Sequence, residues 1–246
     1  MNIRGLSLSN GLTLADIDRR DSLVKRYDTA FGSLAREDKV LSGMDEFSQK
    51  AYEMIRSGRT REAFDLTREP AAISGLFGDG NFSQSCLLAT RLIEAGVRVV
   101  SVTFSDFDTH SKNFSRMRHL VPVVDHAMAT LVTDLRERGM LDDVTIVAWG
   151  EFGRTPKVNA KGGRDHWPRV MGTFLAGGGM KNGQAIGETD WRTGGEATAR
   201  PVHIQEILAT LYHNVGINPL KETLSDLNGR PQFLTDAGRG PLPELV

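Results

Sequence analysis

The chain has 246 residues, a length that suits one large domain or two small ones. Its 30 Lys and Arg residues nearly balance its 31 Asp and Glu residues, so the formal net charge is -1. Nucleic-acid-binding proteins usually carry a basic excess or a basic stripe, and we expect no nucleic-acid partner here. Hydrophobic residues make up 39% and charged residues 25%, which is typical of a soluble globular protein and excludes a disordered chain.

Membrane and export signals are not evident in the sequence. No run approaches the roughly 18 to 20 consecutive apolar residues that a membrane-spanning helix needs, so we expect no membrane span. The N-terminus has no apolar core, so no signal peptide is predicted and the cellular location stays open. The one cysteine, Cys86, excludes an intrachain disulfide, and its apolar helical surroundings favour a buried thiol over a reactive one.

Helices dominate the N-terminal part of the prediction. Residues 10–68 are charged, with apolar residues spaced to cover one helical face and glycines that divide the region into short helices. Further helices are predicted over 83–95, 114–138 and 203–215, and a glycine follows each of the first two, as at many helix ends. The C-terminal tail, rich in Pro and Gly, is predicted to be irregular.

Three apolar runs are predicted to be buried strands: 97–104 (VRVVSVTF), 144–149 (VTIVAW) and 169–176 (RVMGTFLA). Such runs are typical of strands covered on both faces, as in parallel sheets. The first run, the 114–138 helix and the second run would form a βαβ unit with a right-handed crossover. We therefore predict an α/β fold with a mostly parallel sheet flanked by helices. Residues 1–80 would form a helical, charged segment packing on the sheet and 81–246 the α/β region, together making one domain.

Polar side chains follow the predicted strands. In parallel sheets, ligands bind outside the carboxyl ends of the strands, where such side chains meet. Asp108 and His110 lie two residues apart after the first run, so in extended backbone both point to the same side and can reach one ion. A carboxylate and an imidazole are ordinary ligands of zinc, and also suit manganese or iron. The alternative is a loop in which Asp108 accepts backbone hydrogen bonds and His110 is solvated.

Two further segments carry charged groups to the same sheet edge. Glu151 follows the second run and is a candidate metal ligand, with Arg154 directed at an anionic substrate; the alternative is a structural pair between these two side chains. The loop before the third run contains Arg164, Asp165 and His166, which are candidate site residues. The alternative interpretation of this loop is a surface turn held by the Trp and Pro that follow. We expect four side chains to converge within about 8 Å of a common point: Asp108, His110, Glu151 and His166.

Four segments of the chain resemble the bacterial family catalogued as domain of unknown function 1501: FDTHSKNF, GEFGRTPKVNAKGGRDHWP, LAGGGMKNGQAIGETD and PVHIQEILATLYHNVGI. The resemblance covers nearly the whole chain, and the pairing of GEFGRTP with GRDHWP is very specific. Family members usually read WDTH where residues 107–110 here read FDTH, a mild departure. The resemblance implies the fold of the alkaline phosphatase and sulfatase superfamily.

The second predicted strand carries a departure from that superfamily. Its sulfatases and phosphatases contain a segment similar to N-T-L-V-I-F-T-S-D-H-G, whose Asp and His bind metal. Aligned with it, DDVTIVAWGEFG places Glu151 on the Asp and Phe152 on the His. Glu can replace Asp as a ligand whereas Phe cannot replace His, so the resemblance leaves the usual two-zinc arrangement in doubt.

Full members of the family resemble much longer chains that open with a twin-arginine export signal. The resemblance therefore implies that this chain corresponds to the C-terminal portion, with the N-terminal part of the fold missing, including a metal-binding Asp and the nucleophile. No Ser or Thr here follows a recognisable nucleophile pattern, and none is assigned. We expect negligible esterase activity from this chain alone.

The resemblance implies a metal-dependent hydrolase-like domain that acts on a phosphate or sulfate ester through a divalent ion such as zinc, manganese or calcium. The alternative is a non-catalytic metal- or ligand-binding module that keeps the fold, which Phe152 and the missing N-terminal half favour. Three groups of residues carry the leading hypothesis: the metal ligands Asp108, His110, Glu151 and His166; the substrate-binding Arg154 and Arg164; and the supporting Asp106, Asp165 and Asn113.

Self-association is a further expectation. If strands outside the chain complete the sheet, the 97–104 strand or a neighbour lacks a partner, and an uncovered apolar edge favours oligomers or aggregates. The competing view is that the helices of 10–68 cover this edge and close a smaller domain.

Overall fold

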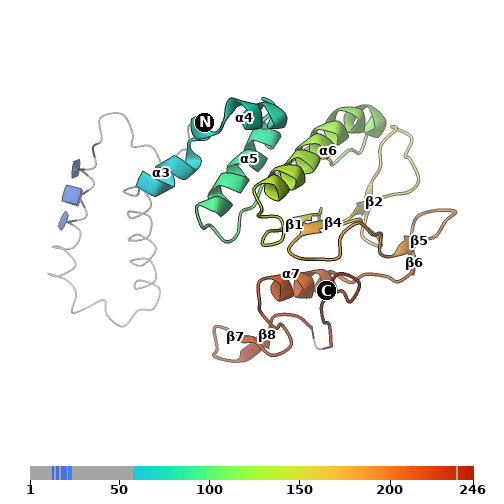
Figure 1. Cartoon of the computed structure of the whole chain (residues 1–246). Coiled ribbons are helices and arrows are strands. Elements are labelled where there is room, and N and C mark those ends of the chain that lie inside the picture. Colours follow the sequence, from blue (N-terminus) through green and yellow to red (C-terminus); the bar gives the residue numbers. More distant parts are fainter. Residues whose placement is uncertain (1–12, 14, 17, 21, 24–57, 237) are drawn as a thin grey trace. The chain divides into compact units, whose positions relative to one another are not determined.

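The computed structural model describes residues 13, 15–16, 18–20, 22–23, 58–236 and 238–246 (Figure 1). The chain divides into two compact units, one made of 1–75 with 87–102 and the other of 76–86 with 103–246. Most of the helical segment predicted over 10–68 lies outside the described residues. The predicted boundary at residue 80 stays a prediction. None of the described helices is both long enough and apolar enough to span a bilayer.

In the first unit, Arg91 links the segments around the short helices through a hydrogen bond and an ion pair. Helix α3 (Gly58–Phe64) is followed by the 3-10 helix η1 (Leu66–Arg68). Arg91, near the end of α5 (Asn81–Glu94), donates from Nε to the carbonyl oxygen of Ala63 at 3.0 Å. The same guanidinium forms an ion pair with Glu69, and both side chains are largely buried. The helical part of the N-terminal prediction is confirmed where it is described.

The first run predicted as a buried strand, 97–104, is not one. No strand is assigned there within the described part of the chain, and Val99 is 81% exposed. At its start, the Val97 amide donates to the carbonyl oxygen of Leu92 at 2.9 Å, and at its end the ring of Phe104 lies 4.6 Å from the ring of Phe82. The β-branched residues favour an extended backbone, but a strand also requires a neighbour that accepts its hydrogen bonds. The expected self-association stays a prediction.

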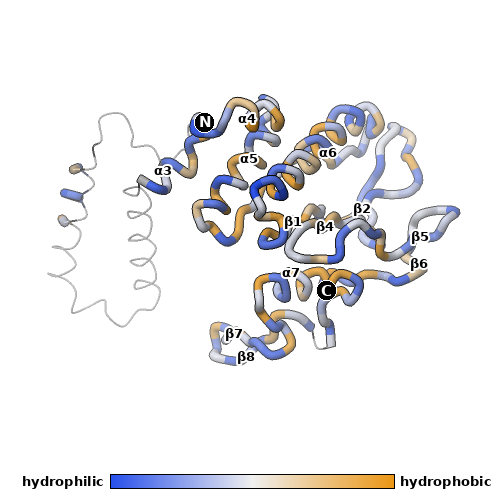
Figure 2. Tube along the Cα trace, in the orientation of Figure 1, coloured by the Kyte–Doolittle hydropathy of each residue, from blue (hydrophilic) through white to orange (hydrophobic). Residues whose placement is uncertain are grey.

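In the second unit, a long helix packs against two short strands. Helix α6 (Asn113–Glu137), predicted over 114–138, follows helix α4 (Ala71–Phe77) and α5 along the chain. Its Leu135 is buried with Ile146 of β1 (Thr145–Ala148) and Ala176 of β4 (Phe174–Gly177). Figure 2 shows hydrophobic residues along α6 and on β1. This apolar contact accounts for the burial of Ile146 and Ala176. Strand β1 lies within the predicted run 144–149, whereas β4 meets only the end of the predicted run 169–176, and the described residues 169–173 form no strand.

The expected mostly parallel sheet is wrong. Strand β1 pairs with β4 in antiparallel register, from Thr145 opposite Gly177 to Ala148 opposite Phe174. The other described sheets are also antiparallel and two-stranded: β2 (Gly153–Arg154) with β3 (His166–Trp167), β5 (Glu188–Thr189) with β6 (Ala197–Ala199), and β7 (Thr223–Ser225) with β8 (Pro231–Phe233). The described chain therefore combines several helices with small antiparallel sheets, and the right-handed βαβ crossover is absent from it. An apolar run reveals burial but neither the partner nor its direction.

Glycine makes the β1–β4 pairing possible. A Cβ atom added at Gly177 would lie 2.2 Å from the carbonyl oxygen of Val144, and its φ of 71° is in the left-handed region. Only glycine meets both demands without strain.

The C-terminal part closes on the last helix. Helix α7 (Ile204–Asn214), predicted over 203–215, begins at His203 with a capping box formed with Glu206. Its buried Ile207 packs with Leu242 and Leu245, so the tail returns to the helix. The prediction of an irregular tail missed this return and the exposed β7–β8 hairpin, because the turn residues that suggest irregularity also occur in hairpins.

Candidate functional site

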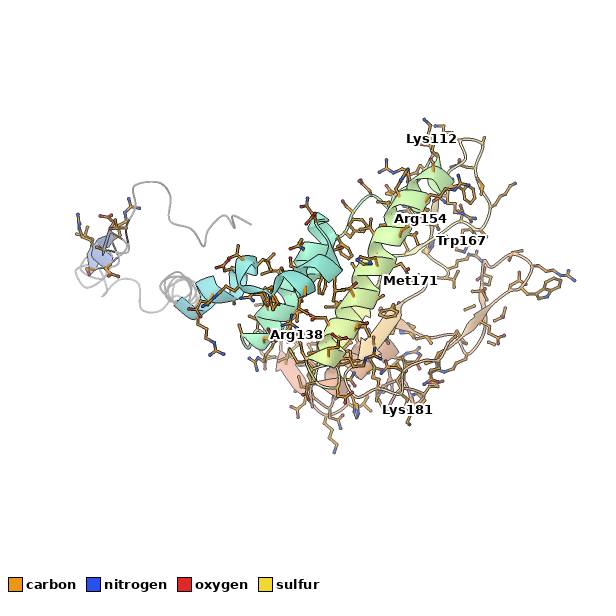
Figure 3. All side chains as sticks on the ribbon, turned by 45° about the horizontal axis from the view of Figure 1, so that its top comes forward. Lys112, Arg138, Arg154, Trp167, Met171 and Lys181 are labelled. Carbon is orange, nitrogen blue, oxygen red and sulfur yellow. The ribbon has the colours of Figure 1, made fainter. Side chains whose placement is uncertain are left out.

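The candidate site is built from a hairpin and the loop that precedes α6. Strands β2 and β3 place Arg154 opposite His166, and residues 155–165 connect them. The preceding loop docks on this connection, because the amide of Arg164 donates to the carbonyl oxygen of Thr109 at 2.9 Å and that of Asn113 donates to Gly162 at 2.9 Å. Figure 3 labels Lys112 at the start of α6, with Arg154 and Trp167 on the hairpin.

Asp108, His110 and His166 meet at this junction. The ligand atoms that they offer all lie within 4.8 Å of one another. Asp108 Oδ1 lies 3.0 Å from His110 Nε2 and 2.9 Å from His166 Nε2. Three of the four predicted ligands therefore come together on the surface, where Asp108 is 62% exposed and the two histidines 49% and 48%.

Arg154 joins the cluster and connects Glu151 to it. The guanidinium Nη1 lies 2.6 Å from Asp108 Oδ1, and Nη2 lies 3.8 Å from Glu151 Oε1. Glu151 is not a member of the group that could hold an ion. Hydrogen bonds from His166 and Arg154 lower the pKa of Asp108 to about 2, so this carboxylate is ionised at neutral pH.

Asp165 sets the orientation of His110. Its Oδ1 lies 2.7 Å from His110 Nδ1, on the side of the ring opposite to Asp108. With the proton on Nδ1, the Nε2 lone pair is available to a cation, an arrangement in which carboxylates commonly support metal-binding histidines. Hydrogen bonds from His110 and Asn159 lower the pKa of Asp165.

No sequence pattern considered above indicated Asn159, yet this residue organises the loop. Its Oδ1 accepts hydrogen bonds from the amides of Lys161 and Gly163 at 3.0 and 2.9 Å. Its Nδ2 donates to the carbonyl oxygen of His110 at 3.1 Å and to both carboxylate oxygens of Asp165 at 3.2 Å. An Asn shortly before a Gly-Gly pair is a turn signal, and this pattern could have identified it.

Gly163 and Thr109 fix the contact between the two loops. A Cβ atom added at Gly163 would lie 2.0 Å from the carbonyl carbon of His110, so only glycine allows this approach. Thr109, between the two candidate ligands, is buried and donates from Oγ1 to Asn113 Oδ1 at 2.5 Å. Asn113 therefore supports the loop from α6. Asp106 points to a different partner, Arg116, at 3.4 Å.

Arg164 and Phe152 contact the site without offering a ligand. Arg164 Nη1 donates to the carbonyl oxygens of Thr155 and Pro156, both at 2.6 Å, which holds the loop. The ring of Phe152 lies 4.4 Å from the ring of His166 and so supports that imidazole. The predicted substrate contact of Arg164 stays a prediction, and Arg154 is the arginine directed into the cluster.

The model of the family described as "Protein of unknown function (DUF1501)" matches residues 1–246, so the chain belongs to this family. Family membership confirms the resemblance that the sequence motifs carry. Comparisons with curated proteins and with solved structures gave no match. The superfamily placement implied by the resemblance finds no support in the described sheets, which are antiparallel and two-stranded.

Proposed function

Starting from membership of the DUF1501 family, we propose that this chain is a metal-dependent hydrolase-like domain, which binds a divalent transition-metal ion and, beside it, an anionic phosphate or sulfate ester. One observation carries the proposal: Asp108, His110 and His166 offer ligand atoms within 4.8 Å of one another. Loops from two distant parts of the chain converge to form this group, and Asp165 and Asn159 hold it in place.

The donor set fits a transition metal. One carboxylate and two imidazoles suit zinc, and also manganese or iron, whereas calcium prefers six to eight oxygen ligands. Three protein ligands leave coordination positions open, as in catalytic zinc sites and unlike closed structural ones. About half of each histidine side chain is exposed, so a substrate can reach the group.

The surrounding residues have separable tasks in this proposal. A bound metal would polarise an ester oxygen and lower the pKa of a water molecule. Arg154 would bind the anionic group, because a guanidinium matches the oxygens of phosphate and sulfate. Asp165 would keep the His110 ring oriented, and Phe152 would restrain the His166 ring.

A non-catalytic binding module is the second candidate. The high exposure of Asp108, His110 and His166 favours it, since a site open to water gains less from electrostatic stabilisation than an enclosed one. In this reading, the chain would bind the same ion and the same anionic groups without turnover.

Metal binding and turnover, measured together, test both candidates. We expect one zinc ion per chain by mass spectrometry after dialysis, lost in His110→Ala and His166→Ala. His119→Ala is the matched control, because His119 is an exposed α6 residue outside the cluster. Absent binding, or binding unchanged in both site variants, would overturn the proposal.

Turnover of p-nitrophenyl phosphate or sulfate then separates the candidates. Zinc-dependent turnover that disappears in His110→Ala supports the hydrolase and contradicts the expected inactivity of the chain alone. Zinc binding without turnover supports the binding module.

A further inference from the structure

We infer that Arg154 couples metal binding to anion binding at the proposed site: it neutralises Asp108 while the metal is absent and is released to the anion when the metal binds. This inference rests on the proposed function and extends it to the regulation of the same site. Its basis is that Arg154 and the two histidines share one oxygen, Asp108 Oδ1.

Three side-chain nitrogen atoms approach Asp108 Oδ1. Arg154 Nη1 lies 2.6 Å from this oxygen, closer than His166 Nε2 at 2.9 Å or His110 Nε2 at 3.0 Å. A metal ion held by Asp108 and both histidines would need the same oxygen. Two cationic groups on one oxygen repel each other, so Arg154 competes with the metal for Asp108.

Arg154 has a weak alternative partner within the described part of the chain. The other carboxylate within ion-pair distance is Glu151, at 3.8 Å, which is longer than a hydrogen bond. The guanidinium carbon lies 5.9 Å from the centre of the Phe152 ring, and the side chain is 20% exposed. Loss of Asp108 as a partner therefore leaves the Arg154 guanidinium available to a new anion.

The backbone keeps a released Arg154 beside the site. Arg154 lies on β2 directly opposite His166 on β3, so the two residues are cross-strand neighbours. The guanidinium can swing away from Asp108 and still reach an oxyanion next to the metal. Its planar fork of donors fits sulfate or phosphate oxygens.

Linkage makes the consequence measurable. If the metal frees Arg154, an anion that binds Arg154 raises the affinity for the metal, and the metal raises the affinity for the anion by the same factor. Without the anion, Arg154 lowers the affinity for the metal. Replacing Arg154 therefore has two opposite effects: tighter metal binding alone, and loss of the enhancement by the anion.

Calorimetric titration of the whole chain with zinc tests this inference, in sodium sulfate and in sodium chloride at equal ionic strength. For the wild type we expect sulfate to lower the Kd for zinc about tenfold. For Arg154→Gln we expect a Kd in chloride about tenfold below that of the wild type, and an effect of sulfate below about twofold. Lys161→Gln is the matched control for charge removal, because Lys161 is exposed in the connection between β2 and β3. This variant should behave as the wild type.

Arg154→Lys is the control for a folding defect in Arg154→Gln. It keeps the positive charge but offers a single point donor, so the enhancement by sulfate should fall clearly below the wild-type value. Equal effects of sulfate on the wild type, Arg154→Gln and Arg154→Lys would overturn the inference while the metal site stands. Unchanged zinc affinity of Arg154→Gln in chloride would overturn it too. Absent zinc binding by both the wild type and Lys161→Gln would overturn the proposed function itself.

Discussion

The α6–β1–β4 core and the candidate site belong to the same unit but are held together by different forces. In the core, Leu135, Ile146 and Ala176 are buried among other apolar side chains. In the site, exposed groups such as Asp108 and His110 are held by hydrogen bonds and ion pairs. Burial stabilises the core in proportion to the apolar area removed from water, whereas exposed ion pairs contribute little to folding. Substitutions in the two regions should therefore separate stability from ligand binding.

The largest effect on stability should come from the core. Leu135→Ala removes a side chain that is 2% exposed, and it should lower the free energy of unfolding by about 2–5 kcal/mol. Urea denaturation followed by circular dichroism measures this change. Leu224→Ala is the control, because Leu224 is 67% exposed on β7 and its loss should change stability by less than about 0.5 kcal/mol. Equal losses in both variants would contradict the burial of Leu135.

Gly163→Ala should lower both the stability of the fold and the affinity for zinc. The new methyl group would collide with the His110 backbone, which should cost about 1–3 kcal/mol of stability and displace a candidate ligand. Gly172→Ala is the matched control, since a Cβ there meets no atom within 4 Å. Thermal melting and zinc titration of both variants provide the test. A Gly163→Ala protein that melts and binds zinc like the control would show that the two loops do not approach as described.

Asn159→Ala should affect the site more than the fold. Loss of its hydrogen bonds to His110 and Asp165 should weaken zinc binding by about 10–100-fold, as for other residues that orient metal ligands. Asn182→Ala, which removes an exposed Asn whose side chain donates to the Met180 carbonyl oxygen of its own turn, should leave zinc affinity unchanged. A site insensitive to Asn159 would mean that the backbone alone orients these ligands.

The smallest effect concerns the Asp108 carboxylate. Because its folded pKa of about 2 is below the ordinary 3.8, its stabilising effect is present above the ordinary pKa and is lost as pH falls through about 2. The contribution to folding is small because the group is exposed. Carbon NMR should show the carboxylate ionised at pH 3, and Arg154→Gln should raise its pKa. Half-titration near the ordinary value in the wild type would mean that the ion pair does not form.

The same contrast explains what the sequence could predict of the fold. Helical patterns located α5, α6 and α7, and glycines marked the ends of α5 and α6, because these signals are local. Apolar runs located β1 and β4 but gave a parallel sheet where the pairing is antiparallel. Pairing depends on contacts between distant residues, which a single sequence does not display. The 97–104 run shows the limit most clearly, since strong β propensity coexists with an exposed Val99.

The sequence predicted most residues of the candidate site but only some of the contacts between them. The spacing of Asp108 and His110 indicated a shared ion, and the loop motif added His166. Glu151, chosen because it follows a buried strand, instead lies near Arg154. Asn159 was missed because its role consists of hydrogen bonds across a loop, which no periodic pattern records.

X-ray absorption spectroscopy of the zinc-loaded chain tests the proposed metal site, because it reports the atoms bound to the metal. We expect two imidazole ligands and one carboxylate oxygen in the wild type, with one imidazole lost in His166→Ala. A coordination shell without imidazole, or one unchanged in His166→Ala, would contradict the assignment of Asp108, His110 and His166 as a metal site.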